Sequence, residues 1–492
     1  MRLRPTLNEA TSIYGLTMLR VGIGGIGTLV VPALLVRQYG LLGLGEWAVV
    51  QAVSAVVGFL ELGLTSSLAR TPIRENLDPH GNLEQWRSCF TYVVIVCSAV
   101  ILTGGLLAAR EHSYGILGPS IVVGTANTIA MLACVPPNAW LLGSGAARKS
   151  YSVNAQATVL RTVGILGPLL LHMSPWFMGV GAALATIYQV LRMYRASLLL
   201  GIRRAYFGLS LRFRPARAHL LFGLNASAST ANELATNYVD KIILGSFCPI
   251  SYVGIFQGVS AATSGIFSVG MTLQGYIFSW FVAERHDGHR PNNAEAARAI
   301  RLFSLLIVCL PYVVSLWLYA RSASILGWWL HIHSGAAVWS MQLVLLAVLI
   351  NLAYVPVVQR LLAAGDARIV GRAAGASAIV NLTLSICLVF SLSLVGVSLA
   401  SLVAVCAAVG VFLAEPLARS CVKASAPGLF IALSVAPVGF LLQHIFDRPG
   451  VKTDLLILTA LCGLAACTLL AARQRIRVAV RWLERPPPKR IP

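Results

Sequence analysis

A succession of long apolar runs, separated by short basic loops, constrains this chain more than any other feature of its sequence. Most runs reach about 20 residues, which at about 1.5 Å of helix per residue is enough to cross the hydrocarbon core of a bilayer. The 492 residues are 57% hydrophobic and only 11% charged, with a mean hydropathy of +0.77. This composition excludes a water-soluble globular protein, so we expect an all-α polytopic membrane protein.

The apolar runs predict about 14 transmembrane helices. Their approximate limits are 14–37, 44–69, 89–109, 115–142, 153–173, 176–200, 218–245, 252–282, 298–320, 338–362, 369–392, 394–416, 425–446 and 452–473. With the N-terminus inside, 27 Lys and Arg fall in the segments expected to be cytoplasmic and five fall in the outer loops. This bias supports the number of spans and predicts that both termini are cytoplasmic.

Charge, cysteine and histidine usage exclude several other classes. The net charge of +21 is spread over short loops without interleaved aromatic residues, so we assign it to membrane topology and anionic lipid headgroups and expect no nucleic-acid partner. None of the ten cysteines forms a C-x-x-C pair, and the nine histidines lack ligand spacing. We therefore expect no metal site and no cofactor.

An internal repeat divides the chain. VPPNAWLLGSGAAR (Val135 to Arg148) aligns without a gap with VPVVQRLLAAGDAR (Val355 to Arg368), and the alignment continues to place Arg161 opposite Asn381. Because six spans separate the copies, both start on the same side of the membrane, which predicts parallel repeats related by an axis along the membrane normal. The expected parts are an N-terminal six-helix lobe (1–200), a basic cytoplasmic linker (201–217), a C-terminal six-helix lobe (218–416), an additional helix pair (417–473) and a basic cytoplasmic tail (474–492).

The seventh predicted span carries a polar stripe. At 100° per residue, one arc of about 100° holds the side chains of Asn225, Ser229, Asn232, Glu233, Thr236 and Asp240. Hydrogen bonds between packed helices would explain the amides and hydroxyls. Two carboxyls favour a polar cavity, because an ionisable side chain at this depth costs a few kcal/mol or more unless it is hydrated or paired. We expect Asn225 and Asn232 to bind substrate and Glu233 and Asp240 to couple ions; an ion pair of Glu233 with Arg20 or Arg161 is the alternative.

Basic residues inside the predicted spans include Arg20, Arg161, Lys241 and Arg360. Arg161 lies about 12 Å into its span, too deep for its side chain to reach the interface easily. Arg20 fits a cavity and an interfacial anchor equally well, whereas Lys241 and Arg360 lie nearer span ends and favour anchoring. We expect Arg161, Arg20 and Asn381 to contribute to substrate binding.

Two stretches resemble a known family. DKIILGSF followed by YVGIFQGVSAA is similar to the start of the second half of the lipid-linked oligosaccharide flippases, and YGLLGLGEWAVVQAVSAVVGFLELGL (Tyr39 to Leu64) resembles their early signature. These O-antigen and exopolysaccharide translocases belong to the MOP superfamily, with the multidrug exporters called MATE. In this chain Glu61 stands where the family more often has aspartate.

The resemblance implies two six-helix lobes plus a terminal pair, located in the bacterial inner membrane. It also implies a polyprenyl-diphosphate-linked oligosaccharide as substrate, no catalytic residues, and a monomer that could work with a polysaccharide polymerase. A MATE-type antiporter of cationic drugs is the alternative, although the deep Arg161 would repel cations. A membrane enzyme such as a polymerase ranks last, because its catalytic residues would need a sizeable outer loop and every predicted outer loop is short.

Overall fold

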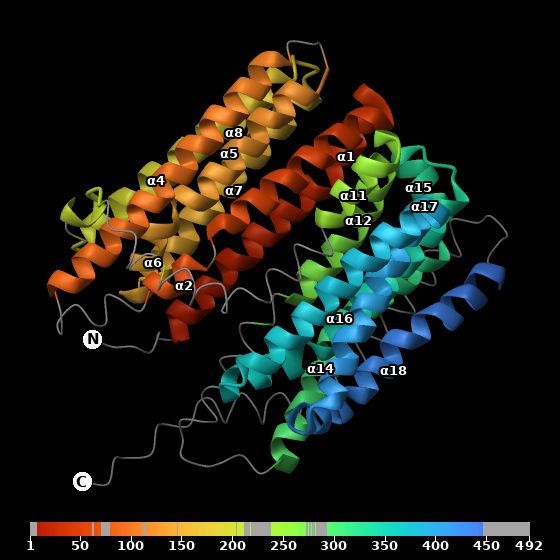
Figure 1. Ribbon diagram of the computed structural model, residues 1–492. Helices are drawn as coiled ribbons and strands as arrows, with labels where there is room; N and C mark the ends of the chain where they lie inside the picture. Colours follow the sequence, from red (N-terminus) through yellow and green to blue (C-terminus); the bar gives the residue numbers. More distant parts are fainter. Residues whose placement is uncertain are drawn as a thin grey trace, which may run out of the picture. The chain divides into compact units, whose positions relative to one another are not determined.

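The computed structural model describes residues 7–61, 63–69, 79–111, 115–144, 146–202, 204–210, 217, 238–271, 274, 277, 281 and 293–445. Regular structure in these residues is entirely helical (Figure 1). Eight of the helices are long and apolar enough to cross a membrane. The prediction of an all-α polytopic membrane protein is therefore confirmed.

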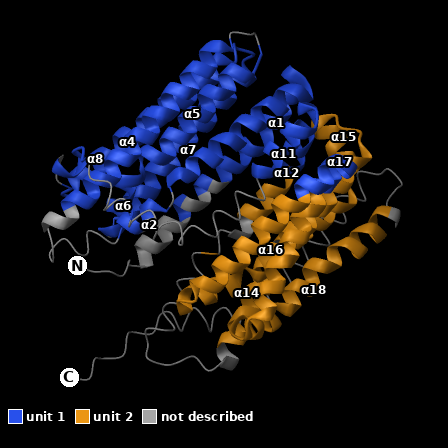
Figure 2. Cartoon of the chain, viewed as in Figure 1, with its two compact units in different colours: residues 1–261, 385–397 blue, residues 262–384, 398–492 orange. Residues whose placement is uncertain are grey.

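The described residues form two compact units, coloured separately in Figure 2. Unit 1 comprises 1–261 and 385–397, and unit 2 comprises 262–384 and 398–492. The boundaries of the lobes and of the terminal pair expected from the sequence remain a prediction.

Unit 1 contains a long broken helix followed by a set of helices of one to several turns. They are α1 (Leu7–Gly58), η1 (Phe59–Glu61), α2 (Leu64–Leu68), α4 (Pro79–Arg110), α5 (Leu117–Ala133), α6 (Val135–Gly143), α7 (Ala147–Leu170), α8 (Trp176–Leu199), η2 (Arg204–Phe207), α11 (Asp240–Phe247) and the first part of α12 (Ile250–Met271). Unit 2 contains the rest of α12 together with α14 (Asn293–Ala320), α15 (Ser322–Leu330), α16 (Gly335–Ala364), α18 (Pro416–Ile445) and α17 (Ala367–Ala414), except that 385–397 of α17 belong to unit 1.

Two helices contain a sharp break, and each corresponds to two predicted spans. Helix α1 breaks at Gly40, whose positive φ of 69° suits a residue without a Cβ, and α17 breaks at Ser393, with φ 47°. The predicted spans 14–37 and 44–69 thus lie on either side of Gly40, and 369–392 and 394–416 on either side of Ser393. Most of span 218–245 and all of span 452–473 lie outside the described residues.

The repeat is visible in helix boundaries. Helices α7 and α17 start at the aligned positions Ala147 and Ala367, each one residue before the end of the aligned proline-containing segment. Cys134 separates α5 from α6, which begins at Val135 with Pro136 in its first turn, whereas α16 continues through Pro356. The two copies therefore share helix starts but differ at the aligned prolines.

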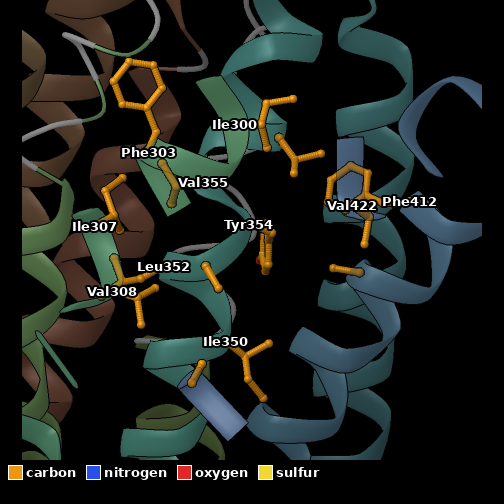
Figure 3. Close-up of a cluster of buried hydrophobic side chains, with 14 of the residues drawn as sticks. Ile300, Phe303, Ile307, Val308, Ile350, Leu352, Tyr354, Val355, Phe412 and Val422 are labelled. Atoms are coloured by element: carbon orange, nitrogen blue, oxygen red, sulfur yellow. The ribbon is translucent and has the colours of Figure 1, made fainter. Parts of the chain in front are cut away.

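Each unit has its own buried core. In unit 2, Tyr354 of α16 contacts Phe412 of α17 with ring centroids 5.8 Å apart, within the cluster drawn in Figure 3. Unit 1 has several smaller clusters, one of them built around Trp86, Trp140 and Tyr206. Helix η2, from the predicted cytoplasmic linker, supplies Tyr206 and is thereby packed against α4 and α6.

Candidate functional site: a polar chain that ends at Arg161

Helices α7 and α8 pack closely in unit 1 and carry several polar side chains. Each has 24 residues, yet neither is among the eight strongly apolar helices. Gly164 of α7 and Gly181 of α8 lie so close that a Cβ built on Gly181 would come within 2.5 Å of the carbonyl oxygen of Gly164. Such close contact between helix backbones brings the polar side chains of both helices within hydrogen-bonding reach of each other.

Arg161 projects from α7 and donates two hydrogen bonds to α8. Its Nη2 atom lies 3.0 Å from Oε1 of Gln189 and 3.5 Å from Oγ1 of Thr186. Its Nε atom is fully buried and has no hydrogen-bond partner among the described residues. The guanidinium therefore retains an unused donor in a region shielded from solvent.

Gln189 continues the contact into a chain of neutral side chains. Its Nε2 donates to Oδ1 of Asn154 (2.9 Å), and Nδ2 of Asn154 donates to Oγ of Ser150 (3.5 Å). The Ser150 hydroxyl donates in turn to Oδ1 of Asn138 in α6. We call these five residues, Arg161, Gln189, Asn154, Ser150 and Asn138, the Arg161 chain.

Among the described residues, no carboxylate balances the charge of the Arg161 chain. Within the described part of the protein, no Asp or Glu forms an ion pair with Arg161, whereas in unit 2 Arg372 pairs with Glu415 at 2.8 Å. The guanidinium of Arg20 on α1 lies within electrostatic range and adds positive charge. Helix α1 lies beside α7 here, because a Cβ on Gly27 would meet Thr162 at 3.4 Å. The arrangement can accept an anion, and it disfavours a cation.

A second set of polar contacts connects α5 to α1 and α8. Asn127 donates to Gln51 of α1 (3.0 Å), and Thr128 donates to the carbonyl of Ser54 (3.1 Å). Thr186, which accepts from Arg161, donates to the carbonyl of Ala126 (3.0 Å). Polar contacts therefore extend from the guanidinium across three further helices of unit 1.

Asp240, expected to couple ions, is completely buried at the start of α11. Its Oδ1 accepts a hydrogen bond from Ser385 at 3.0 Å, and Ser385 comes from the part of α17 that belongs to unit 1. Lys241 is only 6% exposed and lies 5.2 Å from the centre of the Tyr238 ring. The expectation that Lys241 anchors at a membrane interface is therefore wrong, because its head group is enclosed by protein and packs on an aromatic ring.

The other predicted site residues lie in different places. Arg20 is exposed on α1, and Asn381 is buried in unit 2, 14 residues after the start of α17, as Arg161 is 14 residues after the start of α7. Arg360 lies 5.6 Å from the centre of the Phe281 ring. Asn225, Asn232 and Glu233 lie outside the described residues. No group of three metal-ligating side chains occurs in the described part of the chain.

Comparisons with known proteins place the fold. No protein-family model matches the chain, and no curated protein matches it in sequence. Among solved structures, the lipid II flippase MurJ in an inward closed conformation superposes with a TM-score of 0.64, covering 96% of this chain and 100% of the flippase at 12% identity. An inward-facing multidrug-resistance MATE transporter of the MOP superfamily gives a TM-score of 0.55, covering 84% of this chain and 95% of the transporter at 13% identity.

The chain has the fold of the MurJ flippase and of a MATE transporter of the MOP superfamily. The eukaryotic MATE transporter AtDTX14 also superposes, with a TM-score of 0.55 over 86% of this chain and 99% of that protein, at 12% identity. The fold expected from the resemblance to the oligosaccharide flippases is thus confirmed. At these identities the MOP fold is shared by flippases and exporters alike, so substrate must be argued from the residues of this chain.

Proposed function

We propose that this protein moves polyprenyl-diphosphate-linked oligosaccharide units, with undecaprenyl as the lipid, across the bacterial inner membrane by alternating access, for synthesis of cell-surface polysaccharide. The observation that carries the proposal is the placement of Arg161: a guanidinium inside a membrane bundle, bonded to neutral side chains and without a carboxylate partner among the described residues.

A guanidinium at this depth that has no carboxylate partner among the described residues costs several kcal/mol and calls for an anionic ligand. A diphosphate supplies that charge, and its oxygens match the planar fork of donors that arginine presents. The buried Nε of Arg161 provides a further donor for such a ligand. The nearby guanidinium of Arg20 would add attraction over a longer range.

Sugar recognition and energy coupling complete the proposal. Asn225, Asn232 and Asn381 would hydrogen-bond sugar hydroxyls, while Glu233 and Asp240 would bind and release the coupling ion. Asp240 is buried and accepts from a neutral hydroxyl, an arrangement that suits a carboxyl able to exchange a proton or cation. The two six-helix lobes would rock about the substrate site between inward-open and outward-open states.

The proposal also covers the orientation, lipid contacts and partners of the protein in the cell. The protein would act as a monomer with both termini in the cytoplasm, its basic linker and tail attracted to anionic lipids, and a polysaccharide polymerase would use the translocated units. It would carry no enzymatic activity and need no cofactor.

A MATE-type cation antiporter is the alternative, because two MATE structures share the fold at a TM-score of 0.55. Such a transporter needs a cavity that attracts cations, whereas Arg161 and Arg20 place positive charge in the same region of unit 1. The charge of the Arg161 chain therefore favours an anionic cargo.

The decisive experiment is leaflet-resolved quantification of lipid-linked oligosaccharide in cells with and without this gene. We expect deletion to cause accumulation on the cytoplasmic leaflet together with loss of surface polysaccharide, and we expect the wild-type gene to restore both. Single repeats accumulating on the outer leaflet would instead indicate a polymerase. If neither leaflet changes and the deletion strain becomes sensitive to cationic drugs, the flippase proposal is wrong and the exporter takes its place.

A further inference from the structure

The hydrogen bonds of the Arg161 chain all run in one direction. Arg161 donates to Gln189, Gln189 to Asn154, Asn154 to Ser150, and Ser150 to Asn138. Each side chain therefore turns its acceptor oxygen toward the arginine and its donor away from it. Hydrogen bonds aligned in this way polarise one another, and this chain presents the negative end of its dipoles to the guanidinium.

Aligned neutral dipoles have a different effect from a carboxylate. They lower the cost of holding the guanidinium away from water, and they fix its orientation, yet they leave its net charge of +1 intact. A carboxylate in the same place would lower that cost further but would also cancel the charge. A site that must attract an anion and later release it therefore needs neutral dipoles around the guanidinium, because they leave its positive charge available to the anion.

We propose that Gln189 is the positioning residue that keeps Arg161 both oriented and electrically uncompensated, so that the charge state of this one position decides whether the protein binds a diphosphate lipid. This inference rests on the proposed function, because it takes the diphosphate as the ligand of Arg161. Gln189 acts through Arg161, with Asn154 fixing the orientation of the Gln189 amide.

The substitution Q189E separates this role from a purely structural one. If Gln189 only held α7 and α8 together, glutamate would be the better residue, because an arginine–carboxylate pair is stronger than an arginine–amide hydrogen bond. Asn154 can reverse its amide to donate to the new carboxylate, so the contact with α7 survives. The structural role predicts unchanged binding, and our proposal predicts lost binding in a protein at least as stable.

The test uses the purified full-length protein in lipid nanodiscs. Binding of undecaprenyl diphosphate is compared with binding of undecaprenol, which has the same lipid without charge, and the melting temperature is recorded without either probe. We expect Q189E to weaken undecaprenyl diphosphate binding by about tenfold or more while its melting temperature equals or exceeds that of the wild type. Undecaprenol binding should not change.

The matched control is Q156E. Gln156 of α7 accepts a hydrogen bond from Tyr188 of α8 at 2.6 Å, so this variant adds the same charge to the same helix pair without touching Arg161. We expect its undecaprenyl diphosphate affinity to stay within about twofold of the wild type, because Gln156 is exposed and lies about 140° around α7 from Arg161 at 100° per residue.

Three results would overturn the inference. Diphosphate binding by Q189E within twofold of the wild type would refute the role of Gln189 while leaving the proposed function intact. Equal loss in Q189E and Q156E would show that any added charge on α7 and α8 is enough. No preference of the wild type for the diphosphate over undecaprenol would refute the proposed function and this inference with it.

A second variant keeps the test decisive if Q189E does not fold. N154D leaves the bond between Gln189 and Arg161 in place and adds a negative charge one link further along the chain. We expect a smaller loss of diphosphate binding, about threefold, because the added charge lies farther from the guanidinium. Unchanged binding by N154D would then refute the inference.

Discussion

Nη2 of Arg161 lies 3.0 Å from Oε1 of Gln189, so the deepest positive charge predicted from the sequence is held by an amide from the neighbouring helix. The amide is in turn fixed by Asn154, one further link along α7. This relationship changes how substitutions at position 161 should behave, because the site requires both a charge and a defined orientation.

Substitution of Arg161 should separate charge from geometry. We expect R161A to lose at least about tenfold in transport, because it removes every donor and the charge. R161K keeps the charge but loses the planar fork, and we expect it to retain a small, measurable fraction. The measurement is surface polysaccharide in a deletion strain complemented with each variant, at matched abundance in the membrane.

The control for this prediction is R192K on α8. Arg192 is exposed, packs over the ring of Tyr188 at 5.9 Å and makes none of the hydrogen bonds of the Arg161 chain. It should support normal surface polysaccharide. Normal polysaccharide in R161A cells would remove Arg161 from the mechanism.

Much of the fold was predictable because it follows from hydrophobic length. The predicted span 89–109 lies within α4 at Pro79–Arg110, and 338–362 lies within α16 at Gly335–Ala364. Arg161 was predicted as a site residue in a similar way, because its depth in the membrane follows from its position along an apolar run. Apart from Asp240, the polar stripe of the seventh predicted span lies outside the described residues, so the roles assigned to its residues remain predictions.

The polar residues that form the Arg161 chain were not predicted from the sequence, although those on α7 form a recognisable polar stripe. At 100° per residue, Ser150, Asn154, Thr158 and Arg161 share an arc of about 80°, the same kind of polar stripe as in the seventh predicted span. Gln189 could not be inferred in this way. Its contact with Arg161 depends on which face of α8 meets α7, and long-range packing decides that.

Packing of α7 on α8 makes a second prediction, at Gly181. A Cβ there would lie 2.5–2.7 Å from backbone atoms of Gly164, which cannot move as a flexible side chain would. We expect G181A to destabilise the purified protein by about 1–3 kcal/mol, as overpacking does, and to shift Arg161 relative to Gln189. G167A is the control, because a Cβ on Gly167 meets nothing within 4 Å. Equal melting temperatures of the two variants would contradict the close contact.

Asp240 gives a third prediction, which distinguishes its structural contact from its proposed role in coupling. S385A removes a hydrogen bond to a buried carboxyl and should cost about 1–3 kcal/mol of stability. D240N keeps an acceptor oxygen for Ser385 and should fold, but it should lose the dependence of transport on the coupling ion. S391A is the matched control, because exposed Ser391 bonds only the carbonyl of Leu388 in its own helix. Ion-dependent transport by D240N would exclude Asp240 from coupling.

The segment that follows α8 gives the fourth prediction. Tyr206 of η2 is 3% exposed, and its ring lies 6.0 Å from that of Trp86 and 5.9 Å from that of Trp140. Arg87 of α4 donates to the carbonyl of Ala205 at 2.8 Å, so an aromatic anchor and a backbone bond hold the same short helix. Truncating a buried aromatic ring leaves a cavity.

We therefore expect Y206A to lose about 3 kcal/mol of stability and to expose residues 202–210 to protease. The readouts are the melting temperature and the rate at which protease cleaves within residues 202–210, with the cleavage sites mapped by mass spectrometry. L209A is the control, because the Leu209 side chain is 68% exposed and its removal leaves no cavity. If Y206A and L209A were cleaved at the same rate as the wild type, the segment would not depend on Tyr206.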